Sequence, residues 1–262
     1  MSTLAYTLTD SRTMLRRNLV HMMRYPVLTL LLMVTPVVLL LLFVYVLGGT
    51  LGAGLGTAEG ADGYIDYVVP GILIIAIASS GQGTAITVAM DMTEGIVARF
   101  RTMAISRAAV LTGHVLGNVI QTMIGLAVVL GVSLAVGFRP TARPQEWLAA
   151  IGVLALISFA ITWLSVALGM VSKSVEGASN LPMFLLLMPF LGSGFVPTES
   201  MPGPLRWFAE NQPFTPWTET LRGLLTGTPI GNNGWLTIVW CAVIALGGYL
   251  WALNLYNSRS TR

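Results

Sequence analysis

Charged residues are scarce in this chain of 262 residues. It has 14 Lys and Arg and 11 Asp and Glu, so that charged residues make up 10% of the sequence. Soluble domains average about 25% charged residues, which they need to cover their surface. Hydrophobic residues make up 55%, and the mean hydropathy is +0.77. This composition indicates a membrane protein. It excludes a cytosolic enzyme and a nucleic-acid-binding domain.

Cysteine, histidine and lysine are nearly absent, and each absence excludes a kind of site. A single cysteine, Cys241, cannot form an internal disulfide, and two histidines, His21 and His114, are too few for a histidine-based metal site. The only lysine, Lys173, follows no glycine-rich loop, so the chain lacks the phosphate-binding motif of ATPases. A serine protease would need a base beside Ser193, but His114 is expected near the opposite end of its span. We therefore expect no enzyme activity, metal or cofactor in this chain.

Six uncharged apolar segments are each long enough to cross a membrane. A hydrocarbon core of about 30 Å requires about 20 helical residues. The segments are residues 27–47, 68–90, 110–137, 147–171, 177–196 and 235–256. The sequence therefore predicts an all-α, polytopic membrane protein with six transmembrane helices, forming one transmembrane domain over residues 1–262.

Basic residues between these segments are divided unevenly between the two sides of the membrane. One side carries ten Lys and Arg residues, and the other side carries four. The first set is Arg12, Arg16, Arg17, Arg24, Arg99, Arg101, Arg107, Lys173, Arg259 and Arg262; the second is Arg139, Arg143, Arg206 and Arg222. The positive-inside rule places the first set, and with it both termini, in the cytoplasm.

Two segments outside the spans have amphipathic patterns. In residues 8–26, Leu8, Leu15 and Leu19 share one helical face, which predicts a helix lying in the inner membrane interface. Residues 197–228 are rich in proline and contain Trp207, Phe208 and Trp217 at the expected interface, while Glu210, Glu219 and Arg222 are expected on the water side. This segment predicts two short helices, at about 202–209 and 216–225, forming a re-entrant hairpin on the outer face.

Two further segments join the spans. Residues 48–63 contain seven glycines and are expected to form a flexible outer linker. Residues 91–107 carry acids first and bases later, which complements a helix dipole, and they also supply an apolar face. Such a helix could dock in the groove of a partner protein. An ordinary charged loop that obeys the positive-inside rule is the alternative.

Uncharged polar residues gather in the second half of the second span. One interpretation is hydrogen bonding between helices, and the other is a weakly polar wall for an amphipathic passenger. The candidate residues for a substrate path are Ser79, Ser80, Gln82, Thr84, Asn180 and Ser193. We expect this path to face the fifth span.

Two motifs resemble the type-2 ATP-binding-cassette (ABC) permease family, in particular its daunorubicin/doxorubicin-resistance exporter branch. The first is an acid, an E-G pair, an R-F-R run and a terminal S-R: Asp91, Glu94, Gly95, Arg99, Phe100, Arg101, Ser106 and Arg107. The second is Pro197, Met201-Pro202, Trp207-Phe208, Asn211, Pro213 and Leu221-Arg222-Gly223-Leu224-Leu225. Ala104 departs from the pattern, because relatives often have proline there, and this leaves the shape of the loop helix open.

The resemblance implies a permease subunit in a bacterial plasma membrane, paired with a second permease copy or homologue. A separate ATPase subunit would bind ATP and Mg and would contact the eight residues of the first motif. Amphipathic drugs, antibiotics, lipids or glycans would leave the cytoplasm or inner leaflet along the permease dimer interface, lined by spans one, two and five.

Two other classes compete with this assignment. A proton- or ion-coupled carrier is disfavoured because the spans contain no Asp, Glu, Lys or Arg, and His114 is their only ionisable candidate of the kind that carriers use. A membrane-embedded enzyme or assembly factor is disfavoured because the sequence shows no catalytic group of residues.

Overall fold

The computed structural model describes residues 26–54, 61–93, 107–172 and 174–258, and all the elements within these ranges are helical. They are α2 (Pro26–Leu41), the π-helix η1 (Leu42–Val46), α3 (Gly48–Gly54), α4 (Ala61–Thr93), α6 (Arg107–Val136), α7 (Pro144–Val171), α8 (Val175–Asn180), α9 (Met183–Leu187), the 3-10 helices η2 (Met188–Leu191) and η3 (Thr198–Ser200), α10 (Gly203–Asn211), α11 (Phe214–Thr226) and α12 (Asn233–Ser258).

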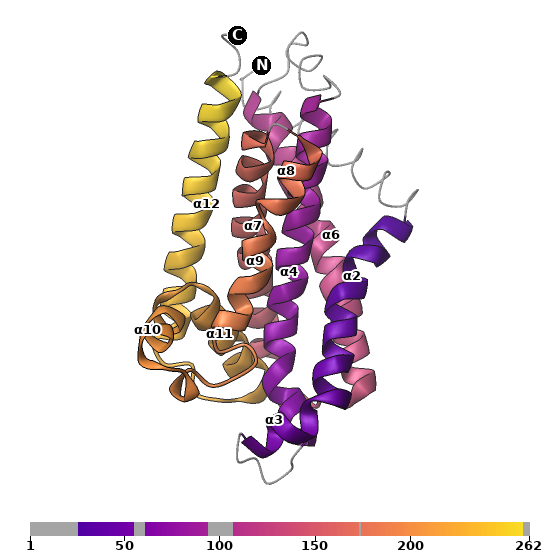
Figure 1. Ribbon diagram of the computed structural model, residues 1–262, viewed down its shortest axis with the longest axis vertical. Helices are drawn as coiled ribbons and strands as arrows, with labels where there is room; N and C mark the ends of the chain where they lie inside the picture. Colours follow the sequence, from indigo (N-terminus) through magenta and orange to yellow (C-terminus); the bar gives the residue numbers. More distant parts are fainter. Residues whose placement is uncertain (1–25, 55–60, 94–106, 173, 259–262) are drawn as a thin grey trace.

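Four helices in the described part of the chain are long and apolar enough to cross a membrane. Their candidate spans, Gly63–Met92, Val115–Val136, Pro144–Val171 and Asn233–Tyr256, correspond to the second, third, fourth and sixth predicted spans. The long helices run along the long axis of the molecule, with α3, α10 and α11 gathered at one end (Figure 1). We call this end of the bundle the hairpin end.

The first predicted span is bent rather than straight. The apolar stretch Met33–Val46 meets α3 at an angle of 69°, and the pair counts as a fifth span only if it is taken as one unit. The expectation of a flexible linker is wrong for Gly48–Gly54, which is helical because Leu51 donates its N–H to the Leu47 carbonyl (2.9 Å) and packs against the core. The predicted interfacial helix over residues 8–26 lies outside the described residues, apart from Pro26 at the start of α2.

The fifth predicted span is divided into short pieces. It comprises α8, α9 and η2, followed by the non-helical residues 192–197. Pro182 caps α9 and Pro189 lies in the first turn of η2, because proline lacks the N–H that would continue the preceding helix. By length and apolar composition, the described residues therefore provide four or five spans rather than six.

The helix α4 lies at the centre of the bundle and is mostly buried, in contrast to α6 and α12. It packs against α2, α6, α7, α8 and α11. Glycine allows its closest approach to the divided span: a Cβ added at Gly71 would lie 2.6 Å from the carbonyl oxygen of Gly194. Because the obstacle is backbone, a larger residue could not be accommodated by a rotamer change.

We predict that Gly71→Ala destabilises the protein by about 1–3 kcal/mol, since overpacking forces backbone shifts. The matched control is Gly152→Ala on α7, where no atom lies within 4 Å of the added Cβ. Unfolding of the purified protein in detergent measures both variants. Equal stability of the two variants would show that the contact between α4 and Gly194 is not tight.

Candidate functional site

A buried arginine joins three parts of the hairpin end. Arg222 on α11 is only 5% exposed. Its Nη2 donates to the carbonyls of Tyr67 (3.0 Å) and Ser193 (2.8 Å), and its Nη1 donates to Oε1 of Glu219 (2.5 Å). Its Cζ also lies 3.7 Å from the centre of the Tyr67 ring, within the range of a cation–π contact. One side chain thus connects α11 to α4 and to the non-helical residues after η2.

The expectation that Arg222 and Trp217 would face water or the interface is wrong. Trp217 is fully buried in the core, and Arg222 faces protein carbonyls that replace its water contacts. The local pattern of α11 indicates an amphipathic helix, but only the packing of α11 on α4 decides which face is buried. Trp207 on α10, by contrast, is 68% exposed.

Two tyrosines of α4 bind the non-helical residues 192–197, which we call the break. The hydroxyl of Tyr67 donates to the Ser193 carbonyl (3.0 Å), and the hydroxyl of Tyr64 donates to the Phe195 carbonyl (3.2 Å). Irregular backbone is tolerated at membrane depth only where protein or a water-filled cavity satisfies its polar groups. The tyrosines meet this requirement from the α4 side.

The hairpin, α10 with α11, binds the same region from the other side. The side-chain amide of Gln212 donates to the Met188 carbonyl (3.1 Å), just before the break. The N–H of Ser193 donates to the hydroxyl of Thr215 (3.4 Å). The two short helices predicted at about 202–209 and 216–225 are confirmed as α10 and α11, with bounds that differ by one or two residues.

Three phenylalanines connect the bent first span to the break. The Phe43 ring, on η1, lies 4.4 Å from the Phe195 ring and 6.2 Å from the Phe190 ring, measured between centroids. The rings of Phe190 and Phe195 are stacked at 4.6 Å. Single-turn π segments within α-helices occur frequently at functional sites. This cluster places the π segment of span one directly against the break in span five.

The polar residues of α4 point in two directions. Ser80 and Thr84 face α6: the Ser80 hydroxyl lies 2.5 Å from that of Thr122, and Asn118 donates to the Thr84 hydroxyl. This is the hydrogen bonding between helices that the sequence left open as one interpretation.

The remaining path candidates are scattered. Gln82 does face the divided fifth span, because its amide donates to the Ser179 carbonyl on α8 (2.8 Å). Ser79 is buried, and its hydroxyl has no hydrogen-bond partner among the described residues. Asn180 is exposed at the end of α8, and Ser193 is buried within the break. The six candidates therefore do not form a single row, and their role in a path stays a prediction.

The predicted coupling residues lie mostly outside the described residues. Asp91 is half-buried in the last turn of α4, and Arg107 is the first residue of α6. The other six, Glu94, Gly95, Arg99, Phe100, Arg101 and Ser106, fall in the segment that the structure does not describe. The 33-residue α4, about 50 Å long, connects this end of the bundle to Tyr64 and Tyr67 at the hairpin end.

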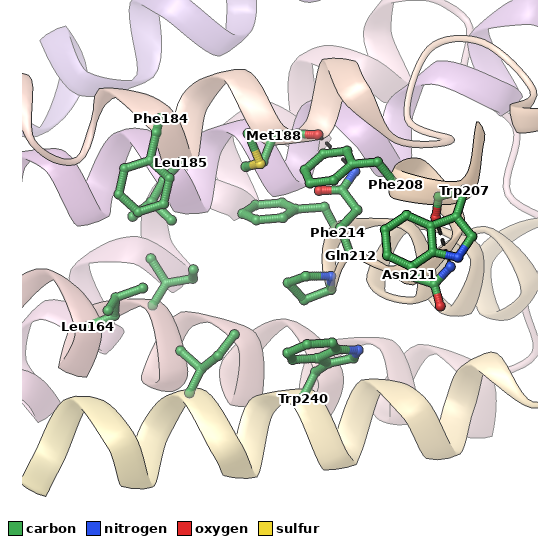
Figure 2. A pocket seen from close by; sticks show the side chains of 13 residues that line it. Leu164, Phe184, Leu185, Met188, Trp207, Phe208, Asn211, Gln212, Phe214 and Trp240 are labelled. Atoms are coloured by element: carbon green, nitrogen blue, oxygen red, sulfur yellow. Dashed lines mark hydrogen bonds between the residues drawn. The ribbon is translucent and has the colours of Figure 1, made fainter. Parts of the chain in front are cut away.

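Sequence reasoning missed an apolar pocket of about 490 Å³ next to the hairpin. Residues of α7, α9, η2, α10 and α12, together with residues 212–214, line it. Trp207 and Asn211 lie at one end, Phe184 and Leu164 at the other, and Trp240 between them (Figure 2). No sequence signal could have found it, since its walls come from elements that are distant along the chain.

The fold and these sites define a multi-pass helical membrane protein. Among the described residues, no group of three His, Cys, Asp or Glu side chains could hold a metal ion. The chain belongs to the ABC-2 type transporter family, whose sequence profile matches residues 9–226. It is therefore a membrane permease subunit of an ABC exporter. This family assignment favours the permease over the ion-coupled carrier and the membrane-embedded enzyme considered from the sequence.

Curated relatives bear names from one branch of this family. The chain is 28% identical over 250 residues to "Daunorubicin resistance ABC transporter permease protein DrrB1" of Streptomyces coeruleorubidus, covering 95% of this chain and 86% of the relative. It is 26% identical over 210 residues to "Probable doxorubicin resistance ABC transporter permease protein DrrC" of Mycobacterium tuberculosis, covering 80% and 76%. These relatives are permease subunits, not enzymes.

We predict that Arg222→Met lowers the free energy of unfolding by about 3 kcal/mol, because the carbonyls of Tyr67 and Ser193 each lose a buried donor and the half-buried Glu219 carboxylate loses its ion-pair partner. Arg206→Met is the matched control. Arg206 pairs with Glu210 (2.7 Å), whose hydrogen bond and charge raise the pKa of Arg206, but the pair is exposed and should contribute little. Equilibrium unfolding in mixed micelles compares the variants. A loss no larger than that of Arg206→Met would contradict a structural role for Arg222.

Proposed function

We propose that this permease exports amphipathic compounds, such as drugs, antibiotics, lipids or glycan-type molecules, from the cytoplasm or inner leaflet. The observation that carries the proposal is the similarity, over most of the chain, to relatives named for daunorubicin and doxorubicin resistance. Predominantly apolar, uncharged spans support a passenger that has large apolar parts. ATP turnover and transport of a panel of amphiphiles, measured with the reconstituted transporter, test the proposal.

A separate ATPase subunit binds ATP and Mg and drives this export. It docks on the segment 91–107, where the acids precede the bases on a short segment with an apolar face. The excess of basic residues supports a cytoplasmic position for this segment and for both termini, in a bacterial plasma membrane. The hairpin end then faces outward, and the hairpin caps the exit as a re-entrant pair of helices.

A second permease copy or homologue completes the path. The passenger moves along the interface between the two permeases, past Gln82, which faces the divided fifth span. The cluster of Phe43, Phe190 and Phe195 lies at the exit end of spans one and five, where bulky apolar side chains could separate to let a passenger leave. The remaining path candidates line or support this route.

We predict that Phe100→Asp uncouples ATP hydrolysis from transport without preventing membrane insertion, because a charged side chain would replace an apolar one at the ATPase contact. The matched control, Thr102→Asp, adds the same charge at a polar position of the same segment. Co-purification of the ATPase and transport in vesicles are the measurements. Wild-type behaviour of Phe100→Asp in both would remove this residue from the contact.

We predict that a cysteine at Gln82 reacts with a water-soluble thiol reagent in at least one nucleotide state. The background is Cys241→Ala, which removes the single native cysteine. Ala76→Cys, buried on the same helix, is the unreactive control. If Gln82→Cys stays as unreactive as Ala76→Cys in every state, the path lies elsewhere.

A further inference from the structure

The apolar pocket beside the hairpin opens on the membrane-facing surface. On its rim, Trp207 is 68% exposed, Phe184 is 45% exposed and Phe208 is 39% exposed. In a multi-pass protein, apolar side chains exposed on the outside of the bundle contact lipid wherever no second subunit covers them. The pocket walls on α7, α10 and α12 lie outside spans one, two and five, along which the second permease is proposed to pack. Lipid chains therefore reach the mouth of the pocket directly.

The depth of the pocket matches one leaflet. Along α12 its lining reaches Ile244, which is the middle of the candidate span Asn233–Tyr256. Ile244 is eleven residues beyond Asn233, or about 16 Å along a helix, which is half of a hydrocarbon core of about 30 Å. The other end lies at Trp207 and Asn211 on α10 (Figure 2). The pocket thus extends from the hairpin end to the middle of the membrane.

The lining of the pocket fits an acyl chain whose polar ester end lies at α10. None of the lining residues is charged, and the side-chain amides present, those of Asn211 and Gln212, belong to the hairpin end of the pocket. Both amides already donate to backbone carbonyls, of Trp207 and Met188 respectively. Ordered water would lack the two to four polar partners that it needs on the apolar walls. An empty pocket would forfeit dispersion contacts that a lipid chain supplies.

We propose that this pocket binds one acyl chain of a phospholipid from the leaflet that adjoins the hairpin. The chain terminus lies near Ile244 and Phe184, and the ester region lies near Trp207 and Asn211, since indole rings favour the interface. The bound chain packs against the pocket-lining side chains of α10 and therefore stabilises the hairpin. The assignment depends neither on the side of the membrane that the hairpin faces nor on the passenger that is exported.

Photo-crosslinking of the full chain in nanodiscs of phosphatidylcholine and phosphatidylglycerol tests the proposal without an ATPase partner. One phospholipid probe carries a diazirine near the chain terminus, and a second carries it near the ester. We expect the first probe to label peptides around Ile244 and Phe184, and the second to label those around Trp207. Labelling of the same peptides by both probes, or even labelling along the exposed face of α12, would overturn the assignment.

A pair of neighbouring substitutions provides the matched control. Ile244→Trp fills the pocket and should remove most labelling of the Phe184 peptide by the chain-end probe. Val243→Trp places the same side chain on the exposed face of α12, where it should leave that labelling unchanged. Retention of wild-type labelling in Ile244→Trp would contradict the proposal. Displacement of the lipid adduct by excess doxorubicin would also overturn it, by identifying the pocket as a passenger site.

Discussion

The pairing of one buried arginine is the constraint on which the hairpin end depends. A guanidinium removed from water is stable only where acceptors replace its hydration, and Arg222 finds them in two carbonyls, a carboxylate and an aromatic face. These acceptors come from α4, from α11 and from the break, so that their positions are fixed together. The break in turn needs the donors of Tyr64, Tyr67 and Arg222, because its carbonyls have no helical partners. The break therefore supplies an acceptor to the Arg222 guanidinium, and Arg222 supplies a donor to the break.

This arrangement makes α4 the mechanical link of the molecule. One continuous helix carries Tyr64 and Tyr67 at the hairpin end and Asp91 at the other end, next to the proposed ATPase contact. Gly71 and Gly194 bring the backbones of α4 and the break into close contact, and the hydrogen bonds of Tyr64 and Tyr67 join them there. A displacement of α4 by the ATPase would consequently move the break and the hairpin with it.

Local sequence signals predicted the parts of the fold that depend on local chemistry. The lengths of the apolar segments predicted four of the spans, and the positions of the prolines predicted α10 and α11, since both properties act locally along the chain. The helix at Gly48–Gly54 and the burial of Arg222 were not predictable, because each depends on packing against distant segments. The site divides in the same way. The density of polar residues in the second span pointed to Gln82, but Thr84 of the same group contacts α6 instead of the fifth span. The pocket and the phenylalanine cluster arise only when separate helices meet.

The central claim is that α4 and the hairpin move as one body. Electron paramagnetic distance measurement tests it most directly, with spin labels at Thr87 on α4 and Glu210 on α10, both exposed. The labels are placed in the Cys241→Ala background, and labelled permease is diluted into unlabelled permease and assembled with its ATPase. The account predicts one narrow distance distribution that is the same without nucleotide and in the ATP-trapped state. A distribution that shifts or splits between the two states would contradict it.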